Sequence, residues 1–242
     1  MATVPYIVVI PARFSSARLP EKMLADIWGK SLIQRTYEQA KQSNAEQVYV
    51  ATDHQEIANQ LEKLGAKVLM TQSHHQSGTL RIASAIEQLH LNPDKIVINV
   101  QGDLPLIEPR LIDQLAEDLN HHPETHMATL AEPMPTWEAL FNINQVQVVV
   151  NAENYALYFS RSPIPWQPSL LKTELHSSTI PENILHHIGI YAYRAKYLAE
   201  FAALPPSPLE TLENLEQLRA LWYGHKIHVA MACVPSVPGV DT

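Results

Sequence analysis

Short apolar runs alternate with amphipathic stretches along the first half of the chain. The first run, Tyr6 to Ile10, is rich in Val and Ile and stops at Pro11, which is typical of a strand buried on both faces of a parallel sheet. Similar runs occupy 47–51, 67–70 and 95–100. Between and after them, apolar residues spaced three and four apart predict helices at about 31–42, 57–64, 80–89 and 111–119. This alternation favours an α/β fold with a right-handed parallel sheet.

The pattern changes in the second half. Apolar and β-branched runs at 127–132, 145–151 and 155–161 follow one another directly, which predicts antiparallel or mixed strands added to the sheet. Further elements are expected as a strand at 187–193, helices at 195–203 and 209–222, and a last strand at 227–234. We therefore expect one domain over residues 1–242, with a mostly parallel central sheet and a smaller antiparallel extension.

A proline-rich segment at about 162–185 separates the predicted strands at 155–161 and 187–193. Its prolines exclude regular elements, and a loop of this length in a compact chain is usually a lid, a partner-binding arm or disordered. Strand-like sequence resumes after it, so it is not a domain boundary. Trp166 lies within it, and an indole is a common anchor at interfaces. We expect the segment to lie at a subunit interface or over the substrate pocket.

Charge and cysteine content narrow the class of protein. The 242-residue chain carries a formal net charge of −8, which argues against a nucleic-acid partner. No apolar run approaches the roughly 18 residues of a membrane span, and the N-terminus enters a strand without a leader pattern. We expect a soluble cytoplasmic protein. Cys233 is the single cysteine, which leaves no disulfide framework, and we expect it to be a buried, inert thiol.

A basic loop follows the first strand, at the carboxyl end where open α/β sheets usually bind ligands. Arg13, Arg18 and Lys22 lie five and four residues apart, and three such cations can neutralise much of a polyphosphate. The alternative is a solvated basic turn. We rank it second, because Leu19 and Met23 would hold the loop against the core. The acidic remainder of the chain suggests that this loop acts locally on a small anion.

Other candidate chemistry is sparse. Asp103 follows the fourth strand and is a candidate metal ligand, although an Asp beside Gly more often forms a turn or a cap. The phosphate-binding glycine motifs and the hydrolase nucleophile elbow are absent from the sequence, which argues against dinucleotide oxidoreductases, P-loop NTPases and serine hydrolases. Histidine pairs at 74/75, 121/122, 186/187 and 225/228 lack zinc-motif spacing. We interpret them as structural.

Seven short motifs are spread over the whole chain. They are Arg13–Lys22, Gln76–Thr79, Asn99–Asp103, Tyr158–Arg161, His187–Tyr191, Leu215–Arg219 and Gly239–Thr242. Together, and in this order, they resemble the 3-deoxy-manno-octulosonate cytidylyltransferase family, the CMP-Kdo synthetases of Gram-negative bacteria. The resemblance implies a three-layer, Rossmann-like nucleotidyltransferase fold and a homodimer. It also implies transfer of CMP from CTP to the anomeric hydroxyl of a 2-keto-3-deoxy sugar acid (Kdo), with release of pyrophosphate, for lipopolysaccharide synthesis.

The resemblance also implies a role for each matching residue. Asp103 and Asp241 are expected to hold Mg²⁺, a hard cation that prefers oxygen ligands. Catalysis is expected from Arg13, Arg18, Lys22, Asp103 and Asp241. The nucleotide is expected to contact Pro11, Ala12, Arg13, Arg18, Lys22, Gln76, Ser77, Gly78, Arg81 and Asp103, and the sugar to contact Gln101, Arg161, His187, Tyr191, Glu216 and Gln217. Without the resemblance, the last four residues would be assigned to strand packing and a solvated helix face.

The chain departs from the family pattern at clustered positions. Glu21 replaces a glycine, Leu80 and Leu104 replace acidic residues, and Gln72 and His74 stand where an arginine and an aspartate are common. The retained cations and carboxylates favour an active enzyme of reduced efficiency. Two alternatives remain: the same transfer to a different sugar acid, and a nucleotide-binding paralogue without turnover.

Overall fold

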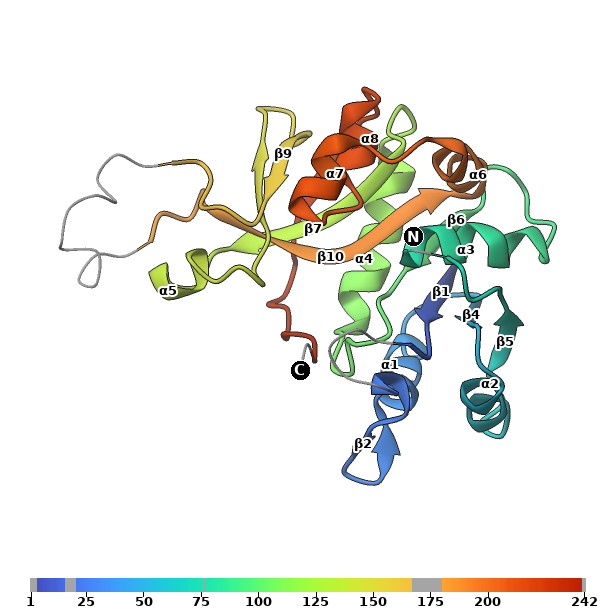
Figure 1. Ribbon diagram of the computed structural model, residues 1–242. Coiled ribbons are helices and arrows are strands. Elements are labelled where there is room, and N and C mark those ends of the chain that lie inside the picture. The colour runs from blue at the N-terminus through green and yellow to red at the C-terminus, as the bar shows by residue number, and fades with distance from the viewer. Residues whose placement is uncertain (1–3, 16–20, 76, 167–179, 241–242) are drawn as a thin grey trace.

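The computed structural model describes residues 4–15, 21–75, 77–166 and 180–240 (Figure 1). Four strands form the parallel half of the sheet in the order β5-β4-β1-β6. Their bounds are Tyr6–Ala12 for β1, Gln47–Thr52 for β4, Lys67–Met70 for β5 and Ile96–Asn99 for β6. The predicted alternation of strands and helices is confirmed here. The central strands β1 and β6 are buried on both faces, as their apolar runs predicted, whereas β5 at the edge is partly exposed.

The second half of the chain extends the same sheet. Strand β10 (Leu185–Arg194) runs antiparallel to both β6 and β7 (Met127–Pro133), and β11 (Ile227–Met231) pairs in parallel with β7 at the edge. Strands β8 (Gln147–Val150) and β9 (Ala156–Ser160) form an antiparallel addition through β10. The mixed extension predicted from the sequence is therefore confirmed.

Helices cover both faces of the sheet, which gives three layers (Figure 1). Val8 and Ile10 of β1 pack with α1 (Leu32–Ala40), α2 (Gln55–Glu62) and α4 (Pro109–His121). Ile7 and Val9 point the other way and pack with α3 (Gly78–Glu87), α6 (Ala195–Ala203) and α8 (Leu218–Trp222). Alternate residues of one strand thus serve two cores. A smaller cluster surrounds α5 (Trp137–Leu140), a short helix that was not predicted.

Pro11 does not stop β1, contrary to the prediction. The strand continues through Pro11 and Ala12, which pair with the end of β4. Proline is tolerated because of its position. Val9 accepts a hydrogen bond from Val100 on the β6 side at 3.4 Å, and alternation along the strand directs the Pro11 nitrogen to that same side, beyond the end of β6. The missing N–H therefore costs no hydrogen bond of the sheet.

The predicted helix at 209–222 is two helices. Ser207 caps α7 (Pro208–Glu213), but Asn214 adopts the left-handed conformation at φ 52° and ends it before α8 begins. A hairpin of β2 (Asp26–Ile27) and β3 (Lys30–Ser31) was also not predicted, because each strand has only two residues.

The expectation of a buried Cys233 is wrong. Pairing of β11 with β7 ends at Met231, three residues short of the predicted strand end, and Cys233 lies beyond it with an exposed side chain. Its backbone N–H donates to the Gln114 side chain at 2.8 Å.

Most of the predicted proline-rich arm lies outside the described residues, at 167–179. No helix within the described ranges is long and apolar enough to cross a membrane.

Close packing at Gly102 yields a prediction. A methyl group on this residue would lie 2.9 Å from both the Met23 Sδ and the Pro11 carbonyl oxygen, one of which is backbone. Gly102→Ala should lower the free energy of unfolding by about 1–3 kcal/mol in urea denaturation. Gly189→Ala is the control, because nothing lies within 4 Å of its added methyl group. Equal stability of the two variants would contradict this packing.

Candidate active site

A cavity of about 190 Å³ opens at the carboxyl ends of β1 and β6. The chain leaves β1 toward β4 on one side and reaches β6 on the other, so the strand order reverses here, as at other ligand sites of open α/β sheets. The lining residues are Pro11, Arg13, Met23, His75, Ser77, Gly78, Arg81, Gln101, Gly102 and Asp103. Seven of the residues predicted to bind nucleotide or sugar therefore line this one cavity.

A buried ion pair fixes one side of the cavity. Arg81 on α3 donates from Nη2 to the Asp53 Oδ2 at 2.9 Å, and the two side chains are 3% and 8% exposed. The other Asp53 oxygen accepts the backbone N–H of Phe14 at 3.0 Å, in the basic loop. Arg81 also donates to the Thr71 hydroxyl at 2.6 Å. Asp53 was not predicted as a site residue from the sequence, although it follows the second strand directly.

Asp103, which lines the cavity, forms an ion pair with Lys22. The Lys22 Nζ lies 2.7 Å from the Asp103 Oδ2, and the Lys22 side chain is 9% exposed while that of Asp103 is 31% exposed. A one-turn helix, Lys22–Leu24, holds the lysine. A carboxylate that lines an open cavity beside a cation has the oxygen donors that a Mg²⁺ ion with phosphate ligands requires. The donor set therefore fits the predicted ion.

The C-terminal tail lies against the same carboxylate-bearing loop. Val240 donates its backbone N–H to the Asp103 carbonyl oxygen at 2.9 Å. At Gly239 an added methyl group would lie 3.1 Å from that oxygen and 3.1 Å from the Leu104 side chain, so the tail packs closely on the loop. The second predicted metal ligand, Asp241, follows directly in sequence but lies outside the described residues. So do two of the predicted nucleotide contacts, Arg18 and Gln76.

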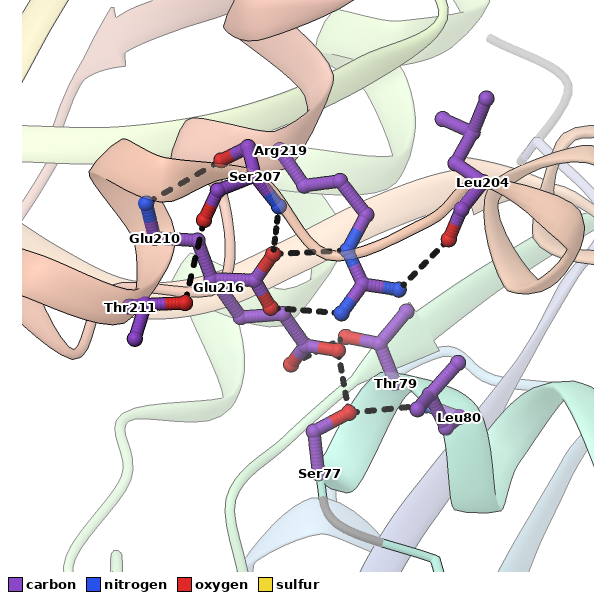
Figure 2. A network of polar contacts seen from close by, with 9 residues as sticks. All are labelled: Ser77, Thr79, Leu80, Leu204, Ser207, Glu210, Thr211, Glu216 and Arg219. Atoms are coloured by element: carbon purple, nitrogen blue, oxygen red, sulfur yellow. Dashed lines mark hydrogen bonds and ion pairs between the residues drawn. The ribbon is translucent and has the colours of Figure 1, made fainter.

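The N-terminus of α3 forms another cavity wall and is tied to a buried carboxyl group (Figure 2). Ser77 caps the helix, and the hydroxyls of Ser77 and Thr79 donate to Glu216, the latter at 2.9 Å. Burial raises the pKa of Glu216, and the two hydroxyl donors oppose that shift. The structure thus places Glu216 against a predicted nucleotide-binding turn and not on a solvated helix face.

Glu216 owes its position to the two short helices on either side of it (Figure 2). The Arg219 guanidinium binds Glu210 through two hydrogen bonds, from Nε at 2.8 Å and from Nη2 at 2.6 Å. Glu210 also completes a capping box with Ser207. A third Arg219 nitrogen donates to the Leu204 carbonyl oxygen at 3.2 Å. This network joins α7 to α8 and directs Glu216 toward α3.

Four other predicted sugar contacts come from three segments: Gln101 after β6, His187 and Tyr191 on β10, and Gln217 at the start of α8. The Tyr191 backbone pairs with Asn99, whose side chain accepts a hydrogen bond from Gln101 at 3.3 Å. The His187 and Tyr191 rings lie 5.4 Å apart. Gln217 is 4% exposed, and its Nε2 has no hydrogen-bond partner within the described ranges. An unpaired buried amide donor is costly unless a ligand accepts it.

Two predicted contacts occupy other positions. Arg161 does not line the cavity; its guanidinium donates to three backbone carbonyls, of Ile143 at 2.8 Å, Glu213 at 2.9 Å and Asn214 at 3.4 Å. Its predicted contact with a sugar carboxylate remains a prediction. Ala12 is buried at the end of β1 and contributes no side chain to the cavity lining.

A family model described as cytidylyltransferase matches residues 7–227. The chain belongs to the cytidylyltransferase family. It is 48% identical over 237 residues, 98% of this chain and 94% of the other, to 3-deoxy-manno-octulosonate cytidylyltransferase of Idiomarina loihiensis.

Solved structures agree with this family. CMP:2-keto-3-deoxy-manno-octonic acid synthetase, complexed with CTP, superposes with a TM-score of 0.87 at 39% identity, covering 98% of this chain and 93% of that chain. A 4-diphosphocytidyl-2C-methyl-D-erythritol synthase has a TM-score of 0.62 at 10% identity, covering 98% of this chain and 92% of that chain. The second likeness supports the fold alone. The expected nucleotidyltransferase architecture is confirmed.

Burial of His187 predicts a pH dependence of stability. Burial, with a smaller contribution from neighbouring His186, lowers the pKa of His187 to about 3. The unfolded chain takes up this proton near pH 6.5, so stability is lost as the pH falls from about 6.5 toward 3, by up to about 1.4 kcal/mol per pH unit. Urea denaturation should give a flatter pH dependence for His187→Gln. The exposed-site control His121→Gln should retain the original slope, and parallel curves for all three proteins would contradict the assignment.

Proposed function

We propose that this chain transfers CMP from CTP to the anomeric hydroxyl of Kdo and releases pyrophosphate. The supporting observation is the cavity, where Arg13, Lys22 and Asp103 lie together at the strand ends. The chain is also 48% identical to a 3-deoxy-manno-octulosonate cytidylyltransferase. The solved relative of 39% identity is complexed with CTP. We further propose that residues 1–242 form a single domain and that the reaction is cytoplasmic and serves lipopolysaccharide synthesis.

The residues at the cavity act mainly by positioning and by charge neutralisation. In this proposal Arg13, Arg18 and Lys22 bind the triphosphate and stabilise the departing pyrophosphate. The N-terminal turn of α3 at Ser77 and Gly78 offers backbone N–H groups to the nucleotide. Bound at Asp103 and Asp241, Mg²⁺ would screen the phosphate charge and favour ionisation of the attacking hydroxyl.

The acceptor sugar is proposed to bind on the β10 side of the same cavity. His187 is neutral at physiological pH because burial lowers its pKa to about 3, so it acts as a hydrogen-bonding group and not as a cation. The Gln217 amide supplies an unpaired buried donor. Glu216 touches the turn that carries Ser77, so the nucleotide and sugar sides share one structural support.

The departures from the family pattern are proposed to lower efficiency without removing activity. Glu21 occupies the glycine position and has a left-handed backbone, φ 56°, which costs a non-glycine residue about 1–2 kcal/mol. Its carboxylate also adds a negative charge near the predicted phosphate site. Leu104 packs against the C-terminal tail, and Leu80 lies in the first turn of α3. These two changes leave the charges of Lys22 and Asp103 in place.

The direct test is pyrophosphate release with CTP, Mg²⁺ and a panel of sugar acids. Release with Kdo supports the proposal. Release only with another sugar acid supports the alternative that the chain transfers CMP to a different acceptor. Binding of CTP without any release would favour the paralogue that has lost turnover.

Asp103→Asn should abolish turnover while the protein remains folded. Asparagine has nearly the same shape and can still accept a hydrogen bond from Lys22, but it lacks the anionic oxygen that Mg²⁺ prefers. We expect pyrophosphate release to fall by about 10²-fold or more. Asp94→Asn, at an exposed ion pair with Lys196, should keep normal activity. Normal Mg²⁺-dependent release by Asp103→Asn would remove this residue from the metal site.

We also propose a homodimer that uses the end of the molecule bearing α5, β9 and residues 161–166 (Figure 1). Four large apolar side chains are exposed there: Phe141 at 50%, Ile143 at 69%, Leu157 at 60% and Trp166 at 53%. Exposed apolar groups gathered at one end mark interaction surfaces.

Trp166→Ala should therefore shift the sedimentation profile toward monomer, because indoles are frequent interface anchors. The matched control is Trp28→Ala, which removes an indole that is 93% exposed on the β2–β3 hairpin. If Trp166 instead covers the sugar, the Michaelis constant for the sugar acid should rise while the sedimentation profile stays unchanged. No change in either measurement would make the segment an ordinary surface loop.

A further inference from the structure

Two histidines and an aspartate meet where the end of α4 packs against the edge strand β11. Asp118 and His122 lie one helical turn apart, and His228 projects from β11 toward them. The His228 Nδ1 lies 2.8 Å from the Asp118 Oδ2, and the His122 Nδ1 lies 3.5 Å from the Asp118 Oδ1. The two imidazole rings stack with their centroids 3.7 Å apart. One ligand atom from each residue lies within 4.8 Å of the others.

This cluster is separate from the nucleotide cavity. Helix α4 starts after the loop that carries Asp103 and runs back along the sheet, so its last turn lies at the amino end of the parallel strands. The side chains of Asp118 and His228 are 10% and 7% exposed, whereas that of His122 is 31% exposed. The cluster is thus largely withdrawn from water but can be reached past His122.

We propose that Asp118, His122 and His228 bind a divalent transition metal of the Zn²⁺ type. Neutral imidazole and carboxylate are ligands that Zn²⁺ accepts, and two His with one carboxylate leave a position for water. Bonds of about 2.0–2.1 Å to a tetrahedral ion place ligand atoms roughly 3.4 Å apart. The present spacing of up to 4.8 Å therefore needs side-chain rotations of about 1 Å, which the partly exposed His122 permits.

Binding balances as a change of tautomer at His228. In the empty cluster the His228 Nδ1 lies 2.8 Å from the Asp118 Oδ2, where an Nδ1–H group can donate to the carboxylate. The metal takes the place of this Nδ1 proton, and the ring carries its proton at Nε2 instead, so the imidazole ligand stays neutral. The negative end of the α4 dipole favours a cation at this position.

One cation and one carboxylate are linked to the cluster through Tyr155. Lys226 lies over the Tyr155 ring, 5.1 Å from its centroid, and the Tyr155 hydroxyl donates to Glu124. Tyr155 in turn packs edge-on against His228, with the centroids 5.5 Å apart. The metal would thus join the end of α4 to the edge strand β11, which makes its expected role structural.

Zn²⁺ binding to the full-length protein tests this site, with a chromophoric chelator as competitor. Excess Mg²⁺ and CTP are present so that the oxygen ligands at Asp103 are occupied. We expect one Zn²⁺ per chain, with binding weakened about 10-fold to 100-fold in His228→Gln and in His122→Gln. His121→Gln is the matched control, because it alters the adjacent exposed histidine of the same helix end. It should bind as the original chain does.

Two further readouts keep the test independent of folding. Zn²⁺ should raise the melting temperature of the original chain and of His121→Gln but not that of His228→Gln, whose circular dichroism should remain native. Co²⁺ should give the visible absorption of a four-coordinate nitrogen-ligated ion only where both histidines are present. Unchanged Zn²⁺ affinity in His228→Gln, or no stoichiometric binding to the original chain, would overturn the proposal and leave a stacked histidine pair bonded to a carboxylate.

Discussion

The buried carboxylate of Asp53 accepts hydrogen bonds from two segments that lie far apart in sequence. One oxygen holds the backbone of Phe14 in the basic loop, and the other pairs with Arg81 on α3. Because both charged side chains are nearly inaccessible to water, removing either partner would leave an uncompensated buried charge and cost about 3–5 kcal/mol. The cavity at the strand ends therefore depends on this ion pair for the relative positions of the basic loop and α3.

The N-terminal turn of α3 is held from α7 and α8 by a second polar network. Glu216 accepts from Ser77 and Thr79, while the Arg219–Glu210 pair fixes the helices around it (Figure 2). The first turn of α3 consequently contacts both the cavity and the segment proposed for the sugar. If nucleotide binding moved this turn, its hydrogen bonds to Glu216 would move Glu216 as well. The binding of the two proposed substrates could be coupled in this way.

The fold could be predicted from the sequence wherever the signal was local. The apolar runs of β1, β4, β5 and β6 and the helices between them follow from periodicity alone. Errors arose where position in the sheet decided the outcome, as at Pro11 within a strand and at the exposed Cys233. Asp53 escaped notice because its partners are 39 and 28 residues away, and the Asp118, His122 and His228 cluster because its members come from a helix and a distant strand.

In the proposed function, CTP with its metal ion binds where the strand order reverses, between β1, α3 and the loop after β6. Hydrogen–deuterium exchange with and without saturating CTP and Mg²⁺ tests this location. We expect slower exchange in peptides that cover 11–15, 77–81 and 100–104, with little change at the α4 and β11 edge. Protection confined to other segments, or no protection at any CTP concentration, would contradict it.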